Sequence, residues 1–203
     1  MAKALAELLD EGVTGRYVLV RSDLNVPLKD GVVTDDGRVR ASLPVIEKLA
    51  KSGARVIVTA HLGRPKGQVD PQYSIAPAAA RLAELASVPV KVAADLVGED
   101  AKAKAADLKD GEVLVLENVR YDARETSKDD AERGAFADEL VALTGKNGAY
   151  VDDAFGAVHR KHASVYDVAK RLPAYLGDLV KKEVDVLSKA LNNPERPFVV
   201  VMA

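Results

Sequence analysis

Short apolar runs rich in valine, isoleucine and leucine recur along this chain. Because each run is apolar at nearly every position, and not at alternate positions, the runs predict strands that are buried on both faces of a sheet. They occupy residues 16–21, 54–60, 88–93, 112–118, 149–153 and 197–202. Parallel strands covered by helices on both sides have this pattern.

The segments between the runs space their apolar residues as helices do. Three stripes have this spacing: Leu43, Ile46 and Leu49; Phe136, Leu140 and Leu143; and Val180, Val184, Leu187 and Leu191. Ser74 and Ser127 are placed to cap two helices, and Asp130 would complete a capping box with Ser127. Alternating strands and helices predict an α/β fold, a Rossmann-like parallel sheet sandwiched by helices with right-handed crossovers.

Composition narrows the classes of function. The chain has 203 residues, 48% of them hydrophobic, and a formal charge of −2, so its surface as a whole does not favour nucleic acid or an anionic membrane. Aromatic residues make up only 4%, which leaves few platforms for stacking bases. The absence of cysteine excludes disulfides, thiolate metal sites and cysteine nucleophiles. No signal peptide or membrane span begins the chain, so we expect a cytoplasmic protein without a metal site.

Arginines stand at the carboxyl ends of four predicted strands. They are Arg21, Arg64, Arg120 and Arg160. In open α/β sheets ligands bind beyond these strand ends, and neighbouring strands lie about 5 Å apart, so the four guanidinium groups can converge on one ligand. Several arginines in one cleft predict a ligand with more than one anionic group. Asp23 and Asn25 would bind a hydroxyl between those groups, and Gly63 and Gly156 would let the backbone approach the ligand.

Simpler roles compete with this hypothesis. A single arginine at a strand end is usually solvated or part of a structural ion pair, whereas four in register favour a binding site. His61 and His162, flanked by arginines, are assigned to the site, whereas His159 has no assigned role. Spacing alone does not decide whether Arg38, at the start of the next helix, reaches the cleft.

Two adjacent carboxylates at the end of one strand could suggest acid–base chemistry. Asp152 and Asp153 are consecutive, however, so in a strand they point to opposite faces and do not share a proton. We expect Asp153 to orient an arginine or to cap the next helix. Neither a G-x-G-x-x-G nor a P-loop pattern occurs, so no nucleotide is expected to bind by those routes.

Several motifs, in order and in register, resemble the phosphoglycerate kinase family. They are VRSDLNVPL, TAHLGRPKG, YSIAP, LENVRY, DDAFGAVHRKHAS and ERPFVVV, and the likeness runs from about residue 14 to the end. The resemblance is to the N-terminal half of that two-domain enzyme. It implies binding of 3-phosphoglycerate or 1,3-bisphosphoglycerate, with Mg-ADP or Mg-ATP as co-substrate on a C-terminal domain and no cofactor bound tightly here.

The resemblance also assigns residues. Asp23 and Asn25 would hold the hydroxyl and carboxyl end of the substrate, and Arg38 would neutralise the transferred phosphoryl group as the catalytic residue. The basic patch around the 3-phosphate would consist of Arg21, His61, Arg64, Arg120 and Arg160 with His162 in support, and the HLGRP turn adds Leu62 and Gly63 to the substrate contacts. The implied reaction is direct in-line transfer, which needs positioning and charge stabilisation more than proton transfer.

The two prolines of NNPERP suggest a domain border. We therefore expect a phosphoglycerate-binding domain at 1–177, an interdomain helix and hinge at 178–197, and the first strand of a nucleotide-binding domain at 198–203. Because VVVMA stops where the family continues into a glycine-rich turn, we expect a truncated, monomeric chain that binds phosphoglycerate without turnover. The apolar tail 198–202 should be disordered or pair with another strand. The alternative function is a non-catalytic module for another small phosphorylated acid.

Overall fold

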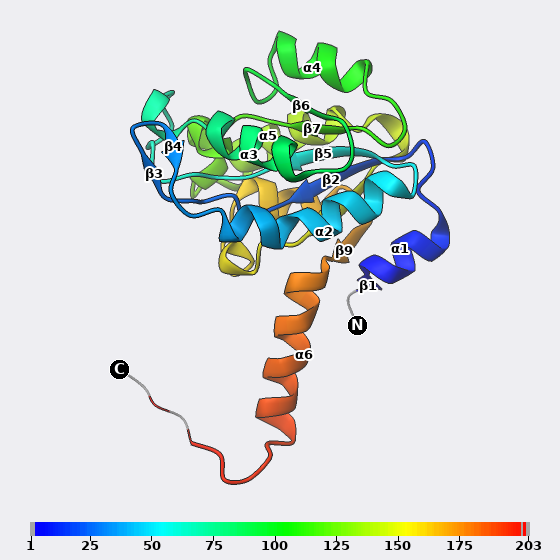
Figure 1. The fold of residues 1–203 in the computed structure, drawn as a ribbon, viewed down its shortest axis with the longest axis vertical. Helices are drawn as coiled ribbons and strands as arrows, with labels where there is room; N and C mark the ends of the chain where they lie inside the picture. Colours follow the sequence, from blue (N-terminus) through cyan, green and yellow to red (C-terminus); the bar gives the residue numbers. More distant parts are fainter. Residues whose placement is uncertain (1–2, 200, 202–203) are drawn as a thin grey trace.

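The computed structural model describes residues 3–199 and 201. Seven parallel strands form one sheet in the order β1-β9-β8-β2-β5-β7-β6, which confirms the predicted α/β fold (Figure 1). The strands are β1 Lys3–Ala4, β2 Tyr17–Arg21, β5 Arg55–Thr59, β6 Val90–Val92, β7 Val113–Val115, β8 Ala149–Asp152 and β9 Ala174–Leu176, and β3 Leu28–Lys29 pairs with β4 Val32–Val33 in a separate hairpin. The helices are α1 Leu5–Glu11, α2 Gly37–Lys51, α3 Ala76–Leu85, α4 Glu99–Ala106, α5 Asp130–Ala142 and α6 Asp178–Asn192.

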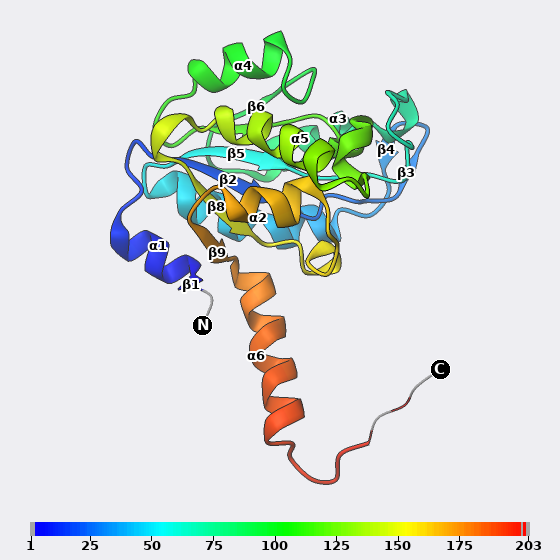
Figure 2. The ribbon, with the colours of Figure 1, turned by 180° about the vertical axis from the view of Figure 1, so that it is seen from behind.

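Helices cover both faces of the sheet, so alternate residues of one strand enter different cores. Val18 and Val20 pack in the core beneath α2 and α3, whereas Leu19 packs in the core beneath α4 and α5. Accordingly α2 lies in front of the sheet in Figure 1 and α5 lies in front of it in Figure 2, the view from behind. Burial on both faces explains why these strands are apolar at consecutive positions.

The predicted strands at 16–21, 54–60, 88–93, 112–118 and 149–153 correspond to β2, β5, β6, β7 and β8. The strands β1 and β9 were not predicted; they have two and three residues and pair with each other at one side of the sheet. In the predicted run at 197–202, Phe198, Val199 and Val201 are exposed and belong to no strand, while 200 and 202 lie outside the described residues.

One predicted helix cap is wrong. The structure begins α5 at Asp130, and Asp129 is its N-cap, with Oδ1 accepting the backbone N–H groups of Ala131 at 2.7 Å and Glu132 at 3.0 Å. Ser127 lies too far ahead of the first turn and instead donates its hydroxyl to Glu132 Oε2 at 2.5 Å. An aspartate at this position serves better because it also carries negative charge to the helix N-terminus.

The last helix projects from the body of the molecule (Figure 1). Its first turn is anchored, because Val180 is fully buried, but Val184, Leu187 and Leu191 of the predicted stripe are 41%, 47% and 80% exposed. The stripe therefore lies on one helix as predicted, and only its first residue joins the core of this chain. Among residues 3–199 and 201, none of the helices combines the length and apolar character that spanning a membrane requires.

Candidate anion-binding site

A cationic cavity of about 570 Å³ opens at the carboxyl ends of four neighbouring strands. These strands, β8, β2, β5 and β7, are adjacent in the sheet, so the loops that follow them meet as the sequence predicted. The cavity is lined by Asp23, Asn25, Arg38, His61, Gly63, Arg64, Lys66, Gly67, Arg120, Thr126, Gly156, Arg160 and His162. Five of these side chains are arginine or lysine, whereas Asp23 is the one carboxylate in the lining.

The turn after β5 is fixed at Gly63. Its backbone N–H donates to Asn25 Oδ1 at 2.9 Å, and its carbonyl accepts from Arg120 Nη1 at 2.8 Å, so one residue joins three strand ends. Gly63 has a φ of +59°, and a Cβ there would lie 2.3 Å from Tyr73 Cδ1. Both the left-handed backbone and the close ring exclude a larger residue.

Asn118 stabilises the turn after β5 through hydrogen bonds of its side chain. Its Oδ1 accepts from the backbone N–H groups of Leu62 at 3.3 Å and Arg120 at 3.1 Å, and its Nδ2 donates to the carbonyls of Leu62 at 2.7 Å and Tyr73 at 2.8 Å. The side chain is fully buried. Asn118 lies within the LENVRY motif but was assigned no role, because Leu62 and Tyr73 are 56 and 45 residues away in the sequence.

Arg38 reaches the cavity from the first turn of α2. Its Nη1 pairs with Asp23 Oδ2 at 2.6 Å, and its side chain is 53% exposed. Asp23 Oδ1 also accepts from the backbone N–H of Asn25 at 3.2 Å. The structure therefore places Arg38 within the cavity, which spacing alone left undecided.

Arg21 and Leu62 are not on the cavity wall. Arg21 is fully buried, where Nε donates to Ser164 Oγ at 3.0 Å, Nη1 to the carbonyl of Ser22 at 2.6 Å, and Nη2 contacts His61 Nδ1 at 3.0 Å. The structure thus corrects the expected position of Arg21, which lies behind His61. Leu62 is likewise buried, at 5% exposure, and forms no part of the lining.

Both histidines of the cavity are held in the uncharged form. Burial is the main cause that lowers the pKa of His61 to about 2, and the nearby Arg21 and Arg120 add to it. Burial, followed by Arg120 and Arg160, lowers the pKa of His162 to about 4. At neutral pH the positive charge of the cavity therefore comes from arginine and lysine, whose charge survives the same surroundings.

Two buried nitrogen atoms around the cavity lack hydrogen-bond partners within the described part of the chain. They are Nε of Arg120 and Nδ1 of His162. Burial and neighbouring arginines also lower the pKa of Arg120. An unpartnered buried donor such as Nε of Arg120 is costly, so an anion that accepts its hydrogen bond would stabilise the arrangement.

Lys66, Gly67, Thr126 and Gly156 complete the lining. Gly156, expected to allow close approach, lies where a Cβ would be 3.5 Å from Asp23 Oδ2. Lys66 belongs to the same HLGRPKG turn as His61, so its place in that turn could have indicated that it lines the cavity. For Thr126, the last residue of the short turn Ala123–Thr126, we find no such signal. His159 is not in the lining.

Asp152 and Asp153 have separate partners and form no acid–base pair. Asp152 Oδ1 accepts the backbone N–H of Ala154 at 3.0 Å, and Asp153 Oδ1 accepts that of Leu179 at 2.8 Å, so Asp153 caps α6. Burial raises their pKa values to about 6 and about 7. Within residues 3–199 and 201 no group of three or more His, Cys, Asp or Glu side chains could hold a metal ion.

The fold and the cavity together define an α/β domain with an arginine-rich cavity at the carboxyl edge of its sheet, where ligands bind in open α/β folds. The sequence model of the phosphoglycerate kinase family matches residues 8–203. The chain therefore belongs to the phosphoglycerate kinase family.

Individual relatives agree with this assignment. The phosphoglycerate kinase of Paenarthrobacter aurescens is 73% identical over 198 residues, and that of Pseudarthrobacter chlorophenolicus is 71% identical over 198 residues; each match covers 98% of this chain and 48% of the relative. The crystal structure of the Pyrococcus horikoshii phosphoglycerate kinase matches with a TM-score of 0.81 and 32% identity, covering 97% of this chain and 47% of that one. A Coxiella burnetii phosphoglycerate kinase matches with a TM-score of 0.75 and 34% identity, covering 92% of this chain and 45% of that one. The chain spans about half the length of these relatives.

Proposed function

We propose that this chain is the phosphoglycerate-binding half of a phosphoglycerate kinase, which transfers a phosphoryl group reversibly between 1,3-bisphosphoglycerate and ADP in glycolysis. The observation that carries the proposal is the cavity with five cationic side chains and one carboxylate at the carboxyl edge of the sheet. A ligand with a phosphate at one end and a carboxylate or acyl phosphate at the other matches this excess of positive charge. Membership of the family supports the same substrate.

In this proposal different lining residues bind different groups of the ligand. Arg64, Arg120 and Arg160 bind the 3-phosphate, with His61 as an uncharged donor at its edge and His162 in support. Asp23 and Asn25 hold the hydroxyl and the carboxyl end. Arg21 acts from behind His61, and Leu62 and Gly63 contribute through the turn that they build.

Arg38 is the proposed catalytic residue. It is more than half exposed and bound to Asp23 by a single ion pair, so it can turn from Asp23 toward a phosphoryl group in transfer. A guanidinium stabilises the charge on that group without any proton transfer. The second substrate would be ADP or ATP with magnesium, bound by a part of the protein that corresponds to the region of the relatives beyond this chain. The phosphoryl transfer would be direct and in line.

The proposal extends to the organisation of the protein. Residues 1–177 form the substrate domain, 178–197 the interdomain helix and hinge, and 198–203 the beginning of the nucleotide domain, which is the partner of this half. The protein acts as a monomer in the cytoplasm, without nucleic-acid or membrane partners. Light scattering after size-exclusion chromatography tests the monomeric state of the chain.

Calorimetric titration of the chain with 3-phosphoglycerate tests the proposed function. We expect saturable binding that Arg64→Ala and Arg120→Ala each weaken roughly 10–100-fold, because a charge-assisted hydrogen bond contributes about 1.5–3 kcal/mol. Arg55→Ala is the matched control, since Arg55 pairs with Asp110 at 2.7 Å outside the cavity. No heat with 3-phosphoglycerate, but binding of other phosphorylated acids, would instead support a non-catalytic module.

A further inference from the structure

A glutamate without any exposed surface lies beneath the anion cavity. Glu125 occupies the short turn Ala123–Thr126 between β7 and α5. Its two carboxylate oxygens both bind Ser164, because Oε2 accepts the backbone N–H at 2.9 Å and Oε1 accepts the hydroxyl at 2.7 Å. Ser164 is itself fully buried. A buried carboxylate is costly unless it serves a structural or functional partner, so its further contacts matter.

Ser164 connects Glu125 to the cavity wall. Its hydroxyl donates its one hydrogen to Glu125 and can therefore accept from Arg21 Nε, which lies 3.0 Å away. Arg21 Nη2 in turn lies 3.0 Å from His61 Nδ1. Because arginine can only donate, Nδ1 of His61 is the acceptor and its proton sits on Nε2. The chain of contacts thus fixes His61 as a neutral donor.

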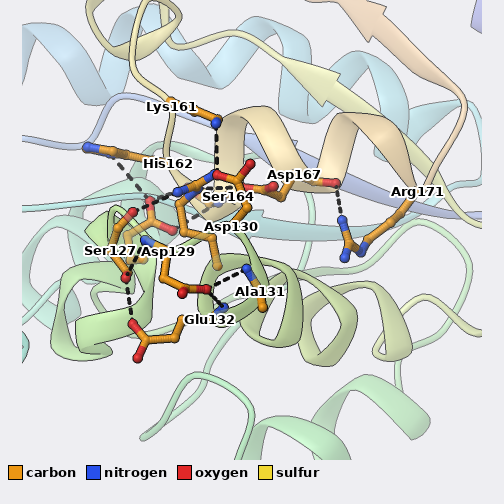
Figure 3. A network of polar contacts seen from close by, with 12 residues as sticks. Ser127, Asp129, Asp130, Ala131, Glu132, Lys161, His162, Ser164, Asp167 and Arg171 are labelled. Carbon is orange, nitrogen blue, oxygen red and sulfur yellow. Dashed lines mark hydrogen bonds and ion pairs between the residues drawn. The ribbon is translucent and has the colours of Figure 1, made fainter.

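His162 forms a second connection to the same carboxylate. Its Nδ1 is buried without a hydrogen-bond partner and lies 3.7 Å from Glu125 Oε1, while the residue also lines the cavity. Figure 3 draws the contacts of both His162 and Ser164. The distance is just beyond a hydrogen bond, so a small rotation of the imidazole would complete one. Nε2 would then remain for a ligand.

Three of the groups around this pair are arginines, and the others are two histidines and a tyrosine. Those that face Glu125 or His162 are Arg21 on β2, His61 after β5, Arg120 after β7, Tyr150 on β8, and His159 and Arg160 after β8. Burial keeps His162 uncharged, and these arginines add to the effect. A bound phosphate dianion would offset them, which favours a positive charge on an imidazole placed between it and a carboxylate.

We propose that Glu125 is the positioning residue of the anion cavity, which orients His61 through Ser164 and Arg21 and provides the counter-charge for His162 when a phosphate group binds. In the bound state the Glu125–His162 pair takes up a proton and His162 bridges the carboxylate and the phosphate. The proposal rests on the proposed function only in needing a phosphate-bearing ligand in this cavity.

The test compares Glu125→Gln with the wild-type chain by calorimetry with 3-phosphoglycerate at pH 7.5, in buffers of different ionisation enthalpy. This pH lies above the second pKa of a phosphate monoester, about 6, so the ligand itself stays dianionic. We expect net proton uptake by the wild type, and in the variant the loss of that uptake with roughly 10-fold weaker binding. Glu47→Gln is the control, because Glu47 binds Ser87 through the same two groups outside the cavity.

Nitrogen NMR of the histidines keeps the proposal testable if Glu125→Gln does not fold. Saturating 3-phosphoglycerate should convert His162 of the wild type to an imidazolium with a hydrogen-bonded Nδ1, whereas His159 should stay unchanged. A wild-type chain that binds the ligand while His162 remains neutral would overturn the role of Glu125 and leave the proposed function intact. A wild-type chain that binds no phosphate-bearing anion would overturn both.

Discussion

Two glutamates in different regions of the molecule each bind one serine through its backbone N–H and its hydroxyl. On the outer side of α2, Glu47 accepts both groups of Ser87, at 2.6 and 2.8 Å, and pairs with Lys51 at 2.9 Å. Beneath the anion cavity, Glu125 accepts both groups of Ser164. The hydrogen bonds lower the pKa of Glu47 to about 2, whereas burial raises the pKa of Glu125 to about 7. Hydrogen-bond partners alone therefore do not fix the charge of a group.

The same contrast holds for the two regions as a whole. Around the carboxyl edge of the sheet, burial is the largest cause of each shift and favours the uncharged forms of Asp152, Asp153, His61 and His162. On the outer surface, ion pairs favour the charged forms, as for Asp130, whose pKa falls to about 2 beside Lys161 and Arg133. Arginine keeps its charge in such surroundings, which suits it to the lining of this cavity.

The largest effect expected from this contrast is that of Arg133→Ala. Arg133 is 1% exposed and donates to Asp167 Oδ2 at 2.9 Å; Figure 3 shows Asp130 and Asp167, its two carboxylate partners. Removing the cation leaves Asp167 buried without compensation, so we expect the free energy of unfolding to fall by about 3–5 kcal/mol. Urea denaturation measures this loss.

The matched surface change is Arg40→Ala. Arg40 pairs with Asp36 at 2.9 Å on the first turn of α2 and is 56% exposed. An exposed pair contributes roughly 0–1 kcal/mol, so the midpoint of denaturation should hardly move. Equal losses in the Arg133 and Arg40 variants would show that burial does not separate the two regions.

The next largest effect is on the pH dependence of stability in Glu125→Gln. The folded-state pKa of Glu125, about 7, lies above its ordinary value of 4.5. The folded state therefore binds the extra proton between these values, and the contribution of Glu125 to stability is present below pH 4.5 and lost as the pH rises through 7. Between pH 4.5 and pH 8 the variant should gain on the order of 2 kcal/mol relative to the wild type.

Urea denaturation of both chains at several pH values measures this gain. It would mean that the wild type keeps a carboxylate that destabilises its folded state at pH 8, as binding sites often do. Parallel stability curves for the two chains would show that Glu125 titrates as an ordinary exposed carboxyl and that the buried environment has no effect on it.

Much of this architecture could be predicted from the sequence. The strands β2, β5, β7 and β8 are continuous apolar runs because both of their faces are covered, and the arginines beyond them identify the ligand edge. The buried position of Arg21 could also have been predicted from the sequence. In β2 it shares the face of Leu19, two residues earlier, and that face is covered by helices.

Other features depend on contacts that no local pattern contains. Glu125 and Ser164 are separated by 39 residues, and only the packing of the turn after β7 against the turn after β8 brings them together. The short strands β1 and β9 have too few residues for a detectable period. The cap of α5 is Asp129 and not the predicted Ser127, because the helix begins two residues later than the sequence pattern suggested.

A smaller effect of opposite sign is expected for Glu47→Gln. The folded-state pKa of Glu47, about 2, lies below its ordinary value of 4.5, so its contribution to stability is present above pH 4.5 and lost as the pH falls toward 2. The variant should be less stable than the wild type at pH 7, by about 1 kcal/mol after allowance for solvent screening. The same denaturation series measures it, and a gain of stability at pH 7 would contradict the assignment.

The smallest effect is expected at the far end of α6, where the same contrast between buried and exposed positions applies. Leu191 is 80% exposed, so Leu191→Ala removes little apolar contact and should change the free energy of unfolding by no more than about 0.5 kcal/mol. Val180→Ala, in the same stripe but fully buried, is the positive control and should destabilise the chain. Denaturation at two protein concentrations distinguishes the outcomes. A clear loss for Leu191→Ala would mean that another surface covers the stripe in solution, and a dependence on concentration would identify that surface as a second copy of the chain.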